Sequence, residues 1–241
     1  MLAEKPWKPD AVLRYLLALF TSIFSGVLLV GWLNSPSSPF AFDPRFVTVV
    51  VGALTFHGMA LALTHFFLRE HDVNWSAGFG FRSPRVGRSL LLAGIVGVAV
   101  LPMAWSLARV SAKIMAKFHF DPIVQDTVQT LQAAESTELK ILLGLLAVFV
   151  APVAEELVFR GILYPAIKQR GFPRLALWGT SLLFAAIHNN AMIFLSLTLL
   201  AVLLTLLYET TDNLLAPILT HSLFNLANFF WLIFQPGVRP L

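Results

Sequence analysis

The chain has 241 residues, of which 57% are hydrophobic and 12% are charged, with a formal net charge of +4 and no cysteine. A soluble domain usually carries about 25% charged residues, so this composition excludes a water-soluble globular protein and favours an integral membrane protein. The lack of cysteine excludes disulfides and thiolate metal sites. The small positive charge is typical of basic loops beside a membrane, and we expect no nucleic-acid surface.

Seven apolar segments are long enough, or nearly so, to cross a bilayer. A hydrocarbon core of about 30 Å needs roughly 20 helical residues. Continuous apolar runs favour helices, because the strands of a membrane barrel alternate in polarity. We therefore expect an all-α polytopic transmembrane bundle of about seven spans, with six to eight compatible, in a single integral membrane domain over residues 1–241. The expected spans are Tyr15–Leu33, Phe46–Leu68, Leu90–Leu107, Ile141–Tyr164, Leu175–Ile187, Ala191–Leu207 and Leu214–Phe234.

The first span is longer than the core of a signal peptide, so we expect it to be retained. The fifth and sixth spans are short, which is typical of tilted or re-entrant helices. Residues 111–137 form the least apolar stretch and predict an interfacial or partly re-entrant helical loop. The tripeptides Arg82-Ser83-Pro84 and Gly171-Phe172-Pro173 interrupt the helices, and the second predicts a tight turn after the fourth span.

The distribution of lysine and arginine predicts the orientation in the membrane. The first set of loops carries Lys5, Lys8, Arg14, Arg69, Arg82, Arg85, Arg88, Lys168, Arg170 and Arg174. The opposite set carries Arg45, Arg109, Lys113, Lys117, Lys140 and Arg239. Because cytoplasmic loops hold the excess of basic residues, we expect the N-terminus in the cytoplasm and the C-terminus outside, in the cell (inner) membrane.

All but two of the 13 acidic residues fall in expected loops or at the ends of spans. The exceptions are Glu155 and Glu156, with Arg160 one turn later. An ionisable residue inside a membrane costs at least about 2.5 kcal/mol, which makes such a residue a candidate for function. At about 100° per residue, Glu156 and Arg160 share a helix face, whereas Glu155 points roughly 140° away from Arg160. We expect Arg160 to neutralise Glu156 and leave Glu155 free to act as a base.

Two later histidines are predicted to reach the glutamates. Glu155 and His188 lie at almost equal distances from the Gly171-Phe172-Pro173 turn, roughly 24 Å along each helix of a hairpin. His221 and Asn225 are spaced i, i+4 on the last span and therefore share a face. Polar groups from three helices are thus expected to converge on one buried pocket.

Each feature alone also has a purely structural interpretation. Glu156 and Arg160 can be a structural ion pair, and His188 can cap the end of a helix. Asn225 can link two helices by a hydrogen bond, as is common in membrane bundles. His57 and His65 on the second span have no acidic residue near them in sequence, and we interpret them as packing or hydrogen-bonding residues. Only the combination on the last four spans favours a functional site.

Three motifs follow one another on these spans: EExxxR within Ala154–Gly161, FxxxH in Phe184–His188 and HxxxN in His221–Asn225. Their order and spacing resemble those of the CAAX protease and bacteriocin-processing family of intramembrane glutamate endopeptidases. The resemblance covers roughly residues 139–234, which become the expected catalytic core, and the N-terminal half resembles no specific family.

The resemblance implies a role for each residue type. In that family the first glutamate and the first histidine are thought to activate water, while the second glutamate and the arginine support them. The second histidine and the asparagine are thought to stabilise the oxyanion. By this resemblance the catalytic residues are Glu155, Glu156, Arg160, His188, His221 and Asn225.

Other intramembrane proteases are excluded, because the sequence contains no HExxH, GxSG or GxGD motif. We expect no cofactor, although two glutamates and two histidines are also a set of metal ligands, so a metal site stays open. The expected partners are the lipid bilayer and a membrane-anchored or hydrophobic polypeptide substrate. A non-enzymatic immunity or partner-binding protein of the same fold and a proton-coupled transporter remain as alternatives.

Overall fold

The computed structural model describes residues 2–40, 43–82, 85–120, 126–134 and 136–234, and within these ranges the chain contains helices and no strand. Six helical stretches are long and apolar enough to cross a membrane. The fifth expected span, Leu175–Ile187, corresponds to a helix of only 14 residues, Pro173–Ala186. The predicted all-α polytopic bundle is therefore confirmed.

Several of the long stretches contain more than one element, because π-helical turns (η) interrupt the α-helices. The elements are α1 (Pro9–Leu33), α2 (Pro44–Gly52), η1 (Ala53–Gly58), α3 (Met59–Glu70), α4 (Trp75–Phe79), α5 (Val86–Lys117), α6 (Asp126–Ala133), α7 (Thr137–Leu145), η2 (Leu146–Val150), α8 (Ala151–Glu156), η3 (Leu157–Leu163), α9 (Tyr164–Lys168), α10 (Pro173–Ala186), α11 (Phe194–Thr211) and α12 (Leu215–Phe234).

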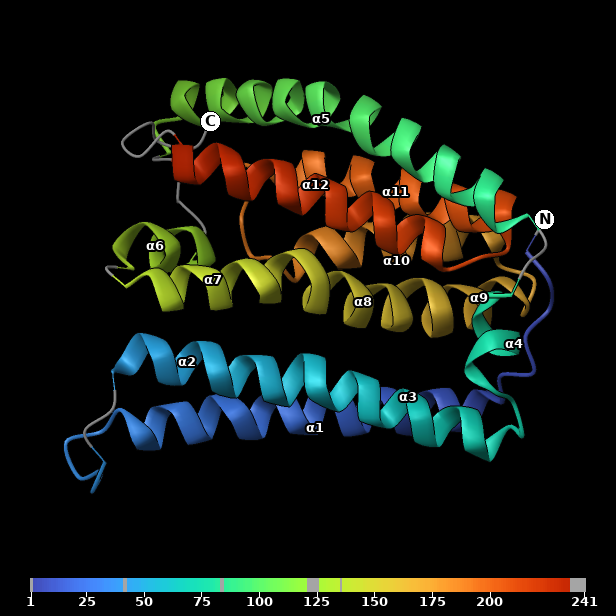
Figure 1. Ribbon diagram of the computed structural model, residues 1–241, viewed down its shortest axis with the longest axis horizontal. Coiled ribbons are helices and arrows are strands. Elements are labelled where there is room, and N and C mark those ends of the chain that lie inside the picture. Colours follow the sequence, from blue (N-terminus) through green and yellow to red (C-terminus); the bar gives the residue numbers. More distant parts are fainter. Residues whose placement is uncertain (1, 41–42, 83–84, 121–125, 135, 235–241) are drawn as a thin grey trace.

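The helices form layers around the long helix that runs from α7 to α9 (Figure 1). On one side lie α1 and the continuous helix α2–η1–α3, and on the other side lie α5, α10, α11 and α12. The helix α12 packs against α5, η2 and α8, while η1 and α3 pack against α8 from the opposite side. The central helix thus contacts both outer layers.

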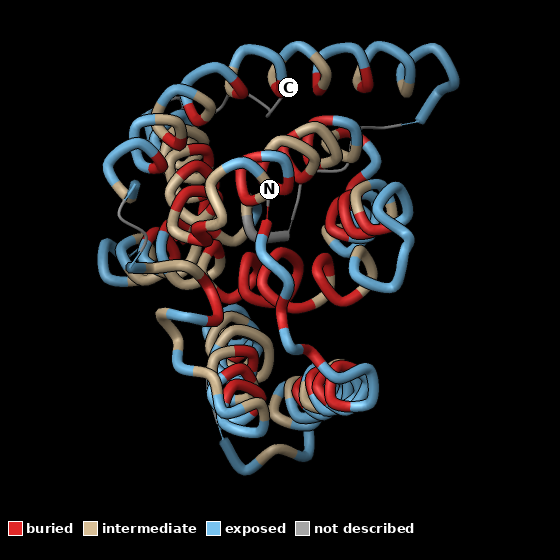
Figure 2. Tube along the Cα trace, turned by 90° about the vertical axis from the view of Figure 1, so that its right-hand side faces the viewer, coloured by how far each residue is buried: buried red, intermediate tan, exposed pale blue. Residues whose placement is uncertain are grey.

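The peripheral helices turn apolar residues outward. Figure 2 shows, from one end of the bundle, exposed residues along the outer faces and buried residues toward the interior. Helix α1, for example, exposes Phe20 (68%) and Val27 (63%), and α5 exposes Val98 (70%). Large apolar side chains that face outward along a whole helix are stable in lipid and unfavourable in water.

The region predicted as an interfacial loop, residues 111–137, begins within a helix. Helix α5 continues to Lys117, so the first residues of the predicted interfacial loop are a regular part of a spanning helix. The loop also contains α6, while residues 121–125 and Glu135 lie outside the described residues. Two residues of the predicted helix interruption, Ser83 and Pro84, also lie outside the described residues. So does Arg239, which was counted in the charge distribution.

Two prolines explain why the central helix leaves the α-helical pattern. In η2 the Ala151 N–H donates to the carbonyl of Leu146, five residues earlier, and the next residue is Pro152, which has no N–H to donate. Farther along, Pro165 cannot donate to the Gly161 carbonyl four residues earlier, and Trp7 Nε1 donates to that oxygen instead at 2.9 Å. Each proline therefore leaves one backbone carbonyl of the central helix without its usual backbone donor, and a side chain from elsewhere in the chain can bind that oxygen.

Candidate active site

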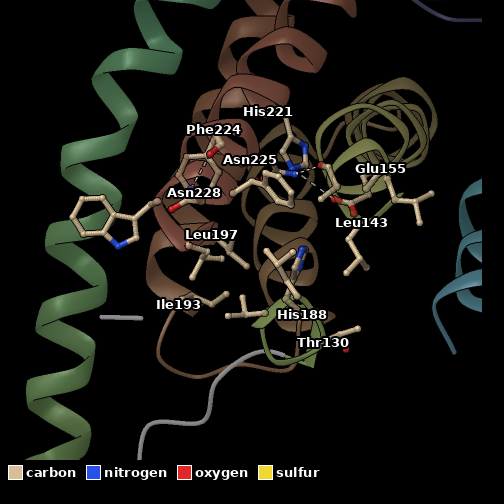
Figure 3. Close-up of a pocket in the computed structure, with 18 of the residues that line it drawn as sticks. Thr130, Leu143, Glu155, His188, Ile193, Leu197, His221, Phe224, Asn225 and Asn228 are labelled. Atoms are coloured by element: carbon tan, nitrogen blue, oxygen red, sulfur yellow. Dashed lines mark hydrogen bonds and ion pairs between the residues drawn. The ribbon is translucent and has the colours of Figure 1, made fainter. Parts of the chain in front are cut away.

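A cavity of about 630 Å³ lies between the layers, and most of its lining is apolar. Glu155, His188, His221 and Asn225 all line this cavity (Figure 3). Glu156 and Arg160 do not line it, and they are only 0% and 1% exposed. The structure thus brings four of the predicted site residues to one cavity and buries the other two beside them.

The ion pair expected from the i, i+4 spacing is present, and it is completely buried. Arg160 Nη1 donates to Glu156 Oε1 at 2.8 Å. The other guanidinium nitrogens donate to α11, Nη2 to the Ala201 carbonyl at 3.0 Å and Nε to Thr205 Oγ1 at 3.4 Å. The guanidinium also lies 4.7 Å from the centre of the Phe184 ring. Arg160 is therefore fixed by three elements, and it holds Glu156 in one orientation.

His221 connects the two glutamates. Its Nδ1 atom donates to Glu156 Oε1 at 2.9 Å, the same oxygen that accepts from Arg160. Its Nε2 atom lies 3.9 Å from Glu155 Oε2. Because an ionised carboxylate only accepts hydrogen bonds, Glu156 fixes the proton of His221 on Nδ1 and turns Nε2 toward Glu155.

Glu155 differs from its neighbour in having no cation bonded to it. Its Oε2 atom is buried and has no hydrogen-bond partner among the described residues. The side chain is 12% exposed and faces the cavity. A carboxylate oxygen without a partner in a buried site costs free energy, and a water or substrate group in the cavity would supply the missing donor.

His188 lies just beyond the end of α10, which is the short helix of the bundle. Its Nδ1 atom is 2.7 Å from the Phe184 carbonyl, which can only accept, so Nδ1 carries the proton. The Nε2 atom of the neutral ring is then an acceptor. His188 lines the cavity (Figure 3). Non-helical backbone inside a membrane is tolerated at such a place, because the cavity can supply hydrogen-bond partners.

Asn225 is positioned by the first of the two prolines. Its Nδ2 atom donates to the Ala147 carbonyl at 2.8 Å. In the register of η2 that carbonyl would accept from residue 152, which is a proline. The asparagine thus takes the place of the missing backbone donor, and the second hydrogen of its amide stays available to the cavity.

Sequence reasoning missed several groups that hold these residues. Phe184 supplies the carbonyl for His188, and its ring lies 4.9 Å from that of His188 and 5.6 Å from that of His221. The i, i+4 spacing of Phe184 and His188 was a usable signal for the first contact. Thr205 and the Ala201 and Ala147 carbonyls carried no comparable signal, because apolar helices give no clue to which backbone oxygens face inward.

Metal binding was left open by the sequence. Among the described residues, no group of three or more histidine, aspartate or glutamate side chains has an arrangement that could hold a metal ion.

Comparisons with known proteins match part of the chain. The family model described as type II CAAX prenyl endopeptidase Rce1-like matches residues 137–227, which include all three motifs. The uncharacterized protein YpbD of Bacillus subtilis (strain 168) is 39% identical over 72 residues, covering 28% of this chain and 34% of YpbD. The similarity therefore spans about a third of the length of that relative. No solved structure matches the chain.

Proposed function

We propose that this chain, which belongs to the CAAX protease family through residues 137–227, is an intramembrane endopeptidase that hydrolyses peptide bonds of membrane-associated polypeptides. The proposal rests on the environment of the Glu155 carboxylate. Its carboxylate faces the cavity with a buried oxygen that has no partner among the described residues, beside the Nε2 atom of His221. Glu156 also has a buried Oε2 atom without a hydrogen-bond partner among the described residues, but its Oε1 atom is bound by Arg160 and His221, and it does not line the cavity.

In the proposed mechanism, Glu155 and His188 activate the attacking water. The water donates one hydrogen to Glu155 and the other to the free Nε2 atom of His188. Glu155 takes the proton as the water oxygen bonds to the scissile carbonyl carbon, and later delivers that proton to the leaving amine as the C–N bond breaks. The cycle consumes one water, returns the proton and needs no nucleophilic serine or cysteine.

His221 and Asn225 are proposed to stabilise the oxyanion of the tetrahedral intermediate. Both residues line the cavity beside Glu155, on the same face of α12. Asn225 has one amide hydrogen free, because the other is bonded to Ala147. His221 can donate only when Nε2 also carries a proton, since Nδ1–H is bonded to Glu156. The proposed role therefore requires the imidazolium form of His221 during the reaction.

The cavity favours an apolar polypeptide as the substrate. Its wall is formed largely by apolar side chains such as Leu143, Leu197 and Phe224. A hydrophobic or lipid-modified segment would bury its side chains there, while its peptide bond reaches the polar end. Residues 139–234 are proposed to hold all the catalytic groups, and the wall is completed by α2, η1 and α5 from the N-terminal half.

The test uses purified protein in detergent and quenched peptides with and without a prenyl group. We expect Glu155→Gln to lower kcat by at least about 100-fold with an unchanged melting temperature, because it removes the base but keeps the shape. Glu138→Gln is the matched control, since Glu138 is exposed on α7 of the same long helix and is expected to behave as wild type.

Two results would contradict the proposal. Equal cleavage by wild type and Glu155→Gln would remove Glu155 from the chemistry. No cleavage of any peptide, together with a biological activity that survives Glu155→Gln, would favour the partner-binding alternative. Loss of activity with EDTA that zinc restores would replace the metal-free mechanism by a metal-dependent one.

A further inference from the structure

A third histidine lines the cavity, and it comes from the N-terminal half of the chain. His57 lies in η1 and faces the same cavity as Glu155, His188 and His221. It stands outside the segment that matches the family model and has no acidic residue near it in sequence. The mechanism proposed above does not use it.

The backbone around His57 is held in place from both sides. In η1 the Met59 N–H donates to the Leu54 carbonyl, five residues earlier, so the helix is locally widened. Ser22 Oγ on α1 donates to the Thr55 carbonyl within this turn at 2.8 Å. The opposite side of η1 packs against α8, the helix of the two glutamates. The π-turn is therefore a fixed part of the cavity wall.

The side chain of His57 is left with an unused hydrogen-bonding atom. Its Nδ1 atom is buried and has no hydrogen-bond partner among the described residues. Two other histidines of this layer behave differently. His71 uses both nitrogens, with Nδ1 at 2.7 Å from the Phe67 carbonyl and Nε2 accepting from Lys8 N at 3.0 Å. His65 is exposed and does not line the cavity.

We propose that His57 is a substrate-binding residue, which hydrogen-bonds to the polypeptide backbone of the substrate beside the bond that is cleaved. This inference rests on the proposed endopeptidase function. A peptide segment in a mostly apolar cavity carries N–H and C=O groups that need partners. A neutral imidazole offers one donor and one acceptor, so His57 can pair with either group. The N-terminal layer thus takes part in substrate recognition, whereas the matched segment supplies the catalytic groups.

The test compares His57→Leu and His57→Asn with His65→Leu, a matched control on the same helix. With a peptide that wild type cleaves, we expect His57→Leu to raise KM roughly tenfold and to leave kcat within about twofold. His57→Asn places an amide near the Nδ1 position and is expected to keep KM within about threefold of wild type. His65→Leu is expected to match wild type in both constants.

Because KM is not always a dissociation constant, binding is measured separately on the inactive Glu155→Gln protein. We expect His57→Leu in that background to weaken binding of the fluorescent peptide by the same factor of roughly ten. Unchanged KM and unchanged binding would overturn the inference. A fall of kcat with unchanged binding would overturn it too, because it would show a part in the chemistry instead.

A separate comparison keeps the inference testable if His57→Leu does not fold. His57→Gln places its amide near the Nε2 position, so it is expected to bind the peptide more weakly than His57→Asn. Equal binding by the Asn and Gln variants would contradict a role for Nδ1. Failure of the proposed function has a different signature, since wild type would then cleave no peptide, whereas failure of this inference leaves wild-type cleavage intact.

Discussion

At the scale of single residues, the two glutamates of the site differ in their hydrogen-bond partners and in their access to the cavity. Glu156 accepts from Arg160 and His221 and is fully buried, whereas Glu155 faces the cavity without a bonded cation. The spacing of Glu156 and Arg160 was sufficient to predict their pairing, because both lie on one helix. The bond from His221 to Glu156 could not be predicted, since it depends on how two helices distant in sequence are packed.

The buried pair predicts a large effect on stability. We expect Arg160→Met to lower the free energy of unfolding by about 3–5 kcal/mol, because it leaves the Glu156 carboxylate buried without its cation. The melting temperature in detergent is the measurement. The double variant Glu156→Gln with Arg160→Met is expected to recover much of the loss, because it removes the charge together with its partner.

Arg14 provides the control for this prediction. Its ion pairs with Asp10 and Glu70 involve side chains that are 41% exposed or more. Such exposed pairs contribute little to stability because water screens them, so we expect Arg14→Met to have a small effect. Similar melting temperatures for Arg14→Met and Arg160→Met would show that the buried pair does not stabilise the fold.

At the scale of elements, the sequence predicted the helices better than their ends and interruptions. Apolar runs gave the position of every spanning helix, since lipid selects for them. The π-turns η1, η2 and η3 were not predicted, because nothing in a hydropathy pattern distinguishes a donor five residues away from one four residues away. The end of α10 before His188 was only suggested by the shortness of that span.

The loop after α4 provides a test at this scale. Gly80 has a positive φ of 73°, and a Cβ atom there would overlap the Asp212 carbonyl in the connection between α11 and α12. The neighbouring Phe79 carbonyl accepts from Leu214 N at 2.9 Å. We expect Gly80→Ala to lower the unfolding free energy by roughly 2 kcal/mol or more, through both backbone strain and overlap.

The control for Gly80 is Gly94 on α5, where a Cβ atom would meet nothing within 4 Å. Gly94→Ala is expected to be neutral or slightly stabilising, because alanine is the better residue within a helix. Thermal unfolding of both variants in the same detergent provides the measurement. Equal stability of the two variants would mean that the loop moves to accept the new side chain.

At the scale of the whole molecule, the two sets of loops predicted from the charges lie at opposite ends of the bundle. The N-terminus, α4 and α9 lie at one end, and the α1–α2 connection and α6 lie at the other (Figure 1). The first end carries the larger set of basic residues, so we propose that it faces the cytoplasm. The cavity reaches α6 through Val128 and Leu131, toward the opposite end.

The absence of cysteine in the sequence makes this orientation easy to test, because any introduced cysteine is unique. Ser37 and Ala77 are exposed and lie at opposite ends of the bundle. In intact cells we expect a membrane-impermeant maleimide to label Ser37→Cys, and to label Ala77→Cys only after the membrane is opened. Labelling in the reverse order would invert the proposed orientation.

The widened turn η1 also changes how related sequences should be compared. A π-turn holds one residue more than the α-helix it interrupts, so it corresponds to a one-residue insertion in an alignment. A relative with a one-residue gap within positions 53–58 would have a regular helix there. Because the π-turn takes up its extra residue within one widened turn, side chains on either side of the gap would keep nearly the same directions. Only the side chains inside the turn, His57 among them, would change direction, so a histidine at the aligned position of such a relative would not by itself line the cavity.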